Sequence, residues 1–295
     1  MKRYLLRRAL QCLPVLALVL VIGFALIRMM PGDPAEVALG VKATKEELAA
    51  ERRRQGLDRP LYTQMAIFAR DVAALRLPHS AQTGRPIAGQ IGGAFLVTLR
   101  LGLGALFIAV AAGLVLGLVS ARWPNGAMDW LARVASVAGV SVPVFWLGML
   151  LLAVFALRLG WLPAGGCRPG ELSGWVLPCL ALGLVYSASL ARVSRAARSK
   201  GLSRWGVVVN HALPNAMIPM VTVIGSQLAG LVTGAVLTET VFGLPGLGTL
   251  LWDAIQSRDR YLLVAVLLFV AAIFVLVNFV VDLAYAWLDP RIRFR

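Results

Sequence analysis

The stretch from Ala191 to Pro219, ARVSRAARSKGLSRWGVVVNHALPNAMIP, is a basic island between long apolar segments. Five cationic residues fall within thirteen positions of it, namely Arg192, Arg195, Arg198, Lys200 and Arg204. Each central Arg or Lys costs about 2.5–3.5 kcal/mol in a membrane-inserted helix, so the island must lie in water. Its positive charge favours the cytoplasm, and we expect a cytoplasmic loop that a soluble partner can reach.

The composition is that of a multi-spanning membrane protein. The chain has 295 residues, of which 59% are hydrophobic and 15% are charged, whereas soluble domains carry about 25% charged residues. The net charge of +15 raises the alternative of nucleic-acid binding. The Lys and Arg residues cluster between apolar runs, however, as membrane-topology signals do, and this distribution argues against a nucleic-acid partner.

Six apolar segments are long enough, or nearly so, to cross a bilayer. They predict an all-α membrane protein with six transmembrane helices and both termini in the cytoplasm. The cytoplasmic segments would then hold thirteen Lys and Arg residues and the short external loops four, in agreement with the positive-inside rule. The six segments are Ala9–Ile27, Ala94–Val119, Leu131–Ala156, Trp175–Leu190, Met217–Leu237 and Tyr261–Trp287.

This topology divides the chain into three regions. Residues 1–30 form the first transmembrane helix, residues 31–93 an external (periplasmic) subdomain, and residues 94–295 a five-helix core with a cytoplasmic loop at 191–216. In the subdomain, Thr44 and Glu47 have the spacing of a capping box at the start of a helix that reaches Gln55, and Gly56 fits its stop. A second amphipathic segment follows at 61–75.

The sequence holds no motif for catalysis, cofactor binding or metal binding. The patterns GxxxxGK[ST], GxSxG and HExxH are absent. The three cysteines form no CxxC pair, and the two histidines are far apart in sequence; a disulfide between Cys167 and Cys179 is left open. Asp282 and Glu239 are the few carboxylates near the spans, too few for an ion-driven carrier. We interpret Glu239 as an interfacial or gate residue.

The basic island has features of a docking helix. Gly201 permits a sharp turn, and Ser203 can cap a short helix that begins near Arg204. Such a helix could seat in a groove on a soluble protein. The alternative is that the positive charges only fix the topology and contact lipid phosphates.

The island also resembles the signature loop of permease subunits of bacterial ATP-binding-cassette importers. The matching positions are Ala196, Ala197, Gly201, Leu202, His211, Ala212, Asn215 and Pro219. Further motifs, in order along nearly the whole chain, resemble the dipeptide, oligopeptide and nickel permease family, and within it the first-permease (B-type) subunit. These motifs are MPGDPAE (30–36), GLDRPLYTQ (56–64), SVPVFWLG (141–148), WLPAGG (161–166), ETVFGLPGLG (239–248) and LDPRIR (288–293).

The resemblance implies a type I importer permease fold in the bacterial inner membrane and a set of partners. These are a second homologous permease, two cytoplasmic ATPase subunits and a periplasmic substrate-binding protein. The substrate would be a dipeptide or oligopeptide, with nickel or another small solute as the alternative. The matching island residues, together with Ser203, would contact the ATPase. Residues implied at the external mouth are Pro31, Gly32, Asp33, Pro34, Glu239, Phe242, Pro245 and Gly246.

The chain departs from the family pattern ahead of Ala196. The family has roughly a dozen further residues there, including an acidic start of the signature, whereas Arg195 here runs straight into Ala196. About three helical turns would be lost from the fourth span or from the coupling helix. A degenerate permease that does not transport is therefore a further alternative.

Overall fold

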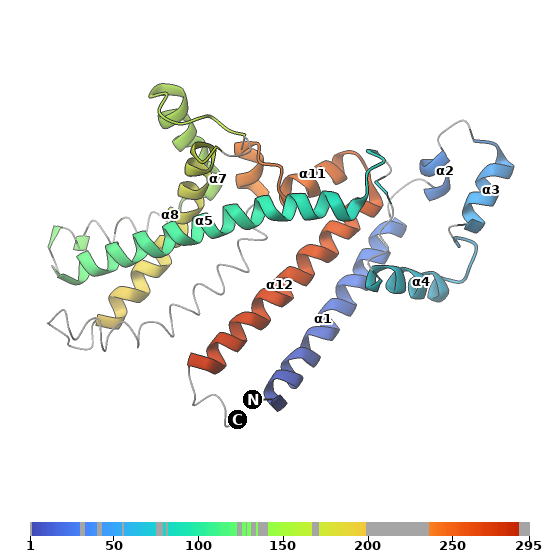
Figure 1. Ribbon diagram of the computed structural model, residues 1–295, viewed down its shortest axis with the longest axis horizontal. Helices are drawn as coiled ribbons and strands as arrows, with labels where there is room; N and C mark the ends of the chain where they lie inside the picture. Colours follow the sequence, from blue (N-terminus) through green and yellow to red (C-terminus); the bar gives the residue numbers. More distant parts are fainter. Residues whose placement is uncertain are drawn as a thin grey trace. The chain divides into compact units, whose positions relative to one another are not determined.

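The structure is a computed structural model of the chain. It describes residues 2–29, 33–39, 43–54, 56–74, 79–80, 82–122, 126–127, 129–130, 134, 141–166, 171–198 and 236–288. Within these ranges the chain is mostly helical and has no strand, and one isolated β-bridge joins His79 to Pro86. The helices are α1 (Lys2–Met29), α2 (Pro34–Leu39), α3 (Lys45–Arg54), α4 (Leu61–Ala73), α5 (Ile87–Arg122), α7 (Val144–Leu151), η1 (Leu152–Arg158), α8 (Ser173–Arg198), α11 (Leu247–Gln256) and α12 (Arg260–Leu288) (Figure 1).

The chain divides into two compact units. The first unit comprises residues 1–9, 95–249 and 273–295, and the second comprises residues 10–94 and 250–272. The second unit therefore holds α1 from Leu10 onward, all of α2 to α4 and the beginning of α12. The first unit holds most of α5 together with α7, η1 and α8.

Among the described residues, three helices are long and apolar enough to span a membrane. They cover Leu10–Met29, Ile87–Gly117 and Arg260–Leu283, and they match the first, second and sixth predicted spans. Shorter apolar helices at Val144–Arg158 and Ser173–Ala188 lie where the third and fourth spans are predicted. The fifth predicted span falls almost wholly outside the described residues.

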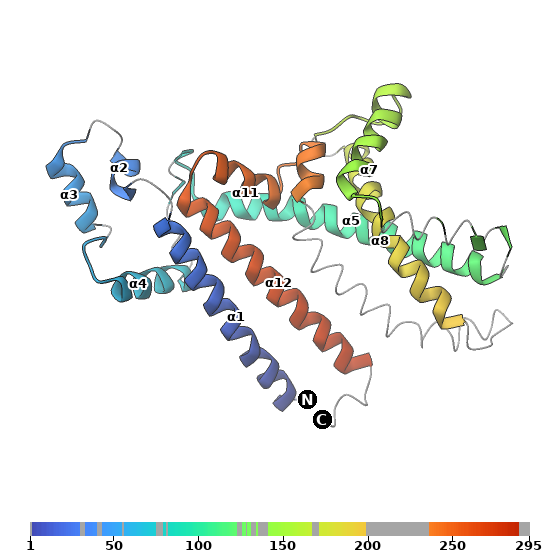
Figure 2. The same ribbon diagram turned by 180° about the vertical axis from the view of Figure 1, so that it is seen from behind.

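In the second unit, α1 packs beside the first turns of α12. A Cβ atom added to Gly23 of α1 would lie 2.8 Å from Cγ1 of Val264 and 3.8 Å from Cγ of Leu268. Figures 1 and 2 show the two helices side by side from opposite directions. The absence of a side chain at Gly23 thus allows the close approach of α1 to α12, as small residues do at helix contacts in membranes.

Helices α3 and α4 begin where the sequence predicts. The backbone N–H of Thr44 donates to Glu47 Oε2 at 2.8 Å, and the N–H of Glu47 donates to Thr44 Oγ1 at 3.3 Å. This is the predicted capping box of α3. Gly56 has a positive φ of 68°, the left-handed conformation that ends helices and that glycine adopts without strain.

Several predicted boundaries are wrong. Helix α5 begins at Ile87, before the predicted start at Ala94, because Ile87 and Ile91 are buried and extend the packed face. Helix α8 continues to Arg198, so the first part of the basic island is helical and not loop. The predicted external loop at 238–260 contains α11 and a short helix at 236–242. Burial of Leu247 and Ala254 on one side stabilises α11.

The third predicted span continues into a π-helix at its C-terminal end. Pro143 precedes α7, and α7 passes directly into the seven-residue π-helix η1. Proline is tolerated at this place because the first N–H groups of a helix have no partner within it. The π-helix ends before Gly160, which has a positive φ of 62°.

Helices α5 and α8 cross at glycines. Gly183 of α8 lies so close to α5 that an added Cβ would be 2.7 Å from Cβ of Ile108 and 2.8 Å from the carbonyl oxygen of Ala105. Figures 1 and 2 both show α8 across α5. The crossing therefore depends on the missing side chain.

We predict that Gly183→Ala destabilises the purified chain in detergent by about 1–3 kcal/mol, because the new methyl group overpacks the crossing. Unfolding by sodium dodecyl sulfate, followed by circular dichroism, measures the change. Gly92→Ala in α5 is the matched control, since nothing lies within 4 Å of its added Cβ. That control should be neutral or stabilising by up to about 1 kcal/mol. Equal stability of the two variants would contradict the prediction.

Candidate functional site

The carboxylate of Glu239 is fully buried and bound on both oxygens. Its Oε1 accepts a hydrogen bond from the Thr98 hydroxyl of α5 at 2.5 Å. Its Oε2 accepts the backbone N–H of Gly248 at 2.7 Å and of Thr249 at 3.3 Å. Thr98 Oγ1 also accepts the N–H of Leu247 at 2.8 Å. Glu239 and Thr98 together thus bind the first three N–H groups of α11.

This arrangement caps α11 from outside its own sequence. The first N–H groups of a helix have no partner within the helix, and the dipole makes that end positive. A carboxylate from the preceding helix and a hydroxyl from α5 satisfy them here. A buried carboxylate is tolerated only when it is paired in this way. The network therefore fixes the 236–249 segment, which runs from the short helix into α11, against α5.

Gly246 is required for the carboxylate to fit. A Cβ atom at this position would collide with the Glu239 carboxyl group. The turn around it is closed by the Thr249 hydroxyl, which donates to the carbonyl oxygens of Leu244 at 2.8 Å and Gly246 at 2.9 Å. Pro245, between them, is exposed. The motif thus has one face bound to the protein and one face open.

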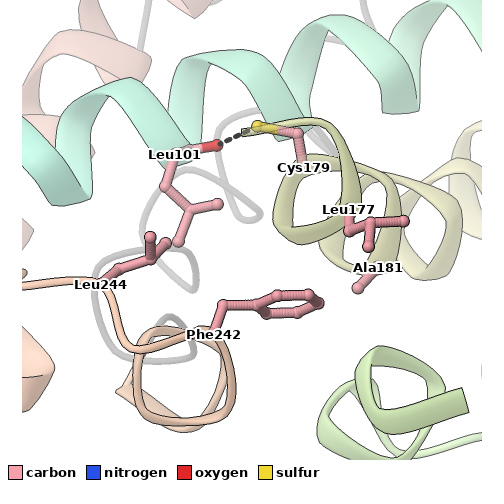
Figure 3. Packing of buried hydrophobic residues seen from close by; sticks show 6 residues of the cluster. All are labelled: Leu101, Leu177, Cys179, Ala181, Phe242 and Leu244. Carbon is pink, nitrogen blue, oxygen red and sulfur yellow. Dashed lines mark hydrogen bonds between the residues drawn. The ribbon is translucent and has the colours of Figure 1, made fainter. Parts of the chain in front are cut away.

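Phe242 lies at the centre of a hydrophobic cluster. Its side chain is 2% exposed and packs with Leu244 from the same segment, Leu101 from α5 and residues of α8. Figure 3 shows these side chains facing one another, with the Cys179 thiol 3.9 Å from the carbonyl oxygen of Leu101. The cluster consists of Leu101, Leu177, Cys179, Ala181, Phe242 and Leu244.

Three of the sequence motifs meet at Phe242. Gly148, from the motif at 141–148, leaves only 3.0 Å between an added Cβ and the Phe242 ring. Gly165, from the motif at 161–166, lies against the Phe242 backbone. A Cβ atom added to Gly165 would be 2.8 Å from the carbonyl oxygen of Phe242. The N–H of Gly166 donates to that same oxygen at 3.0 Å. The glycines of two motifs thus make room for the third.

A second polar group of residues orders α2, α3 and α4 in the other unit. Asp33 caps α2, since its Oδ1 accepts the N–H of Ala35 at 2.9 Å, and its Oδ2 binds Arg52 Nε of α3 at 2.6 Å. The buried Gln64 of α4 accepts a hydrogen bond from Arg28 at the end of α1. Its amide also donates to the carbonyl oxygen of Arg59 at 2.6 Å. These contacts hold α2 to α4 together near α1.

Burial acts to raise the pKa of Asp33, but the Ala35 N–H and the Arg52 guanidinium outweigh it. The net result is a pKa below the usual value of 3.8. The positive charge of Arg260 adds to this lowering. The carboxylate of Asp33 is therefore ionised over the whole physiological pH range.

Another buried carboxylate lies in the second unit. Asp259 is 1% exposed, and its Oδ1 accepts the N–H of Leu262 at 3.1 Å, which caps α12. Its Oδ2 accepts the Ser80 hydroxyl at 2.6 Å. Sequence reasoning missed Thr98, Ser80 and Asp259. Asp before a long apolar helix is a recognisable cap signal, but the hydroxyl partners lie far away in sequence and gave no signal.

The predicted site residues fall into three groups. Glu239, Phe242, Pro245 and Gly246 lie together in the first unit, and Asp33 and Pro34 belong to the second. Ala196 and Ala197 lie in the last turn of α8. The remaining predicted residues lie outside the described part of the chain, namely Pro31, Gly32, Gly201, Leu202, Ser203, His211, Ala212, Asn215 and Pro219.

No metal-binding group is found among the described residues, where no three His, Cys, Asp or Glu side chains lie close enough to share an ion. Cys179 is buried in the apolar cluster around Phe242. Cys167, the other half of the disulfide that the sequence leaves open, lies outside the described residues.

Comparison with known proteins identifies the family. Residues 113–294 match the family described as "Binding-protein-dependent transport system inner membrane component", and residues 1–97 match the N-terminal membrane-component family of the same systems. The chain belongs to this family of binding-protein-dependent transport permeases. It is a permease subunit of an ABC importer of the peptide and glutathione group.

Curated relatives align over their whole length. The glutathione transport system permease protein GsiC of Escherichia coli strain K12 is 38% identical over 308 positions that cover 100% of both chains. The protein of the same name from Shigella dysenteriae serotype 1 matches equally well, with 38% identity and full coverage of both chains. Both are permease proteins, in agreement with a transporter subunit and not an enzyme.

Solved structures share the fold. The inward-facing MetNI methionine ABC transporter matches with a TM-score of 0.56 and 18% identity, over 68% of this chain and 97% of that chain. An amino acid ABC transporter matches with a TM-score of 0.51 and 18% identity, over 68% and 94%. The all-α membrane fold of a type I importer permease is thereby confirmed.

We predict that Phe242→Ala destabilises the chain by about 3–5 kcal/mol, because it leaves a large cavity between α5, α8 and the 236–249 segment. Thermal unfolding of the purified chain in detergent measures the change. Phe107→Ala is the matched control, since Phe107 of α5 is 76% exposed. The control should stay within about 0.5 kcal/mol. A similar loss in both variants would argue against a special role of the cluster.

We also predict that the order of α2 depends on pH through Asp33. Its lowered pKa contributes stability that is complete above the unfolded-state pKa near 3.8 and is lost as the pH falls through the lowered folded-state pKa. Hydrogen exchange of residues 33–39 at pH 6 and at pH 3 measures this in wild type and in Asp33→Asn. Only the wild type should lose protection on acidification.

Arg52→Ala, which removes a half-exposed ion pair, should lower the stability of this region by less than about 1 kcal/mol.

Proposed function

We propose that this chain, paired with a second homologous permease, forms the path by which an ATP-driven importer carries short peptides across the bacterial inner membrane. The observation that carries the proposal is the full-length identity of 38% to a permease named for glutathione transport. Glutathione is a tripeptide with two carboxylates, so the relative is named for the transport of a peptide of three residues. Dipeptides and tripeptides are the substrates that we propose here.

Binding-protein-dependent importers work with ATPase subunits and a substrate-binding protein, and we assign each a place on this chain. The two ATPase subunits bind the two permeases, one of them at the cytoplasmic loop 191–216 of this chain, and Gly201, Ser203 and Asn215 lie at that contact. The binding protein meets the external side, at the 31–93 subdomain and the 236–249 segment. Both termini are cytoplasmic, as the excess of Lys and Arg on that side favours.

The cycle that we propose requires no reaction on this chain. ATP binding closes the two ATPases, draws the coupling loops together and opens the path outward, and ATP hydrolysis resets it. The continuation of α8 supports this, because the helix extends without a break to Arg198, inside the basic island. A rigid helix transmits a push at its end better than a loop would.

Two alternatives follow from particular observations. Nickel or another small solute remains a rival substrate, because the sequence motifs are common to peptide and nickel permeases. A degenerate permease is the other rival. The alignment with GsiC spans 308 positions, 13 more than the 295 residues of this chain. That difference agrees in size with the dozen residues that the resemblance places ahead of Ala196.

The test of coupling uses the complex with its cognate ATPase and binding protein. We predict that Gly201→Asp abolishes stimulation of ATP hydrolysis by the loaded binding protein, because a carboxylate disturbs the turn before the docking helix. Gly89→Asp is the matched control, at an exposed position in the first turn of α5 with nothing within 4 Å of an added Cβ. It should retain stimulation. Failure of the wild-type chain to co-purify with an ATPase would favour the degenerate permease.

The test of substrate uses a strain that lacks this permease. Labelled glutathione, a labelled dipeptide and radioactive nickel are offered separately, with and without the wild-type gene. Uptake of the peptides alone is the expected result. Gene-dependent uptake of nickel alone would replace the peptide proposal by the metal one.

A further inference from the structure

We propose that Glu239 and Thr98 are a positioning pair that makes the 236–249 segment move as one body with α5 and α8. Through this body, movement of α8 at the cytoplasmic loop reaches the far end of the path. This inference rests on the proposed ATP-driven function, because it assigns the residues that transmit the movement. It concerns neither a substrate contact nor the docking contact itself.

The first joint of this body is the crossing of α5 and α8. An added Cβ on Gly104 would lie 2.6 Å from the Cys179 thiol and 3.6 Å from Cys179 Cβ. One turn further along α8, Gly183 lies equally close to Ala105 and Ile108. Each helix thus has a glycine at the point where the other helix approaches it most closely. Two helices in such contact cannot slide without repacking.

The second joint is the network of Glu239. Its four hydrogen bonds link α5, the short helix and the first turn of α11, and two of them join a carboxylate to backbone N–H groups. Charge-assisted bonds of this kind are among the strongest in proteins. Separation of Thr98 from Glu239 would leave a buried carboxylate incompletely paired, which is costly. The segment and α5 therefore remain joined when either moves.

The third joint connects α8 to the segment directly. Phe242 packs against Leu177 and Ala181 of α8 within the same cluster as Leu101 of α5. Figure 3 shows the three parts meeting around the Phe242 ring. A displacement of α8 thus acts on the segment from two sides, through the cluster and through α5. Helix α8 ends at Arg198 in the basic island. A movement of the cytoplasmic loop would therefore act first on this end of α8.

The decisive variants change only the Thr98 hydroxyl. Thr98→Val keeps the shape and removes the hydrogen bonds, whereas Thr98→Ser keeps the hydroxyl. In the assembled importer, Thr98→Val should lower substrate uptake and the stimulation of ATP hydrolysis by the loaded binding protein about tenfold or more. Basal ATP hydrolysis should not change, and uptake is expressed per assembled complex because loss of the Thr98 hydrogen bonds also lowers stability. Thr98→Ser should restore coupling to near the wild-type level.

Ser80→Ala is the control for stability alone. Ser80 donates to the buried carboxylate of Asp259, so its loss removes the same kind of bond in the other unit. It should lower the melting temperature while uptake per complex and stimulation stay near wild type. If Ser80→Ala and Thr98→Val reduce coupling alike, or if Thr98→Val leaves it intact, the positioning role is overturned.

A cross-link tests the common movement directly. Gly104→Cys, in a background with Cys12 and Cys167 changed to Ser, places a thiol against the native Cys179. The Cβ–Cβ distance of 3.6 Å falls within the range of disulfides. Oxidation should join α5 to α8 and leave uptake and stimulation within about twofold of the reduced sample, because parts of one body do not move apart. Loss of transport on oxidation, with recovery on reduction, would overturn the inference.

The outcomes separate this inference from the proposed function. A wild-type chain that binds no ATPase and supports no uptake overturns both. A wild-type chain that couples normally, together with a Thr98→Val variant that couples equally well, overturns only the positioning pair. Uptake that is lost in Gly201→Asp but kept in Thr98→Val likewise overturns only the positioning pair and supports the proposed function.

Discussion

The pairing of the buried Glu239 carboxylate constrains much of the first unit. A carboxylate without water must find donors, and here it finds the start of α11 and the hydroxyl of Thr98. To supply them, α11 must begin where it does, and Gly246 must lack a side chain. Thr98 must also face this point of α5. The short motif around Glu239 is therefore a set of mutually dependent positions and not a flexible loop.

Close helix packing is the second constraint. A membrane gives helices little hydrophobic reason to associate, so contact depends on shape and on small residues. Because Gly104 and Gly183 have no side chains, α5 and α8 can approach closely. Gly148 and Gly165 leave room for Phe242 in the same way. The glycines that interrupt the apolar segments thus mark contacts between elements. Their spacing in sequence is irregular because they serve contacts with several different neighbours.

For an ABC importer permease, these contacts indicate how the chain would take part in the ATP-driven process that we propose. The proposed role is the transmission of movement, which requires rigid contacts between selected helices and freedom elsewhere. The continuous α8, its crossing with α5 and the capped α11 are such joints. Helices α2 to α4, ordered by Asp33 and Gln64, form a separate polar framework in the other unit.

The sequence by itself determined the membrane class, most apolar spans, the capping box at Thr44 and the family, because hydrophobicity, cap residues and motifs are local properties. It also selected Glu239, Phe242 and Gly246, but as members of a motif without contacts. Only the tertiary structure decided that Thr98 binds Glu239, that Ser80 binds Asp259, and that α11 is a helix within a predicted loop. The physical reason is that these depend on partners more than a hundred residues away, and a hydroxyl in an apolar helix carries no sign of which distant group it will bind.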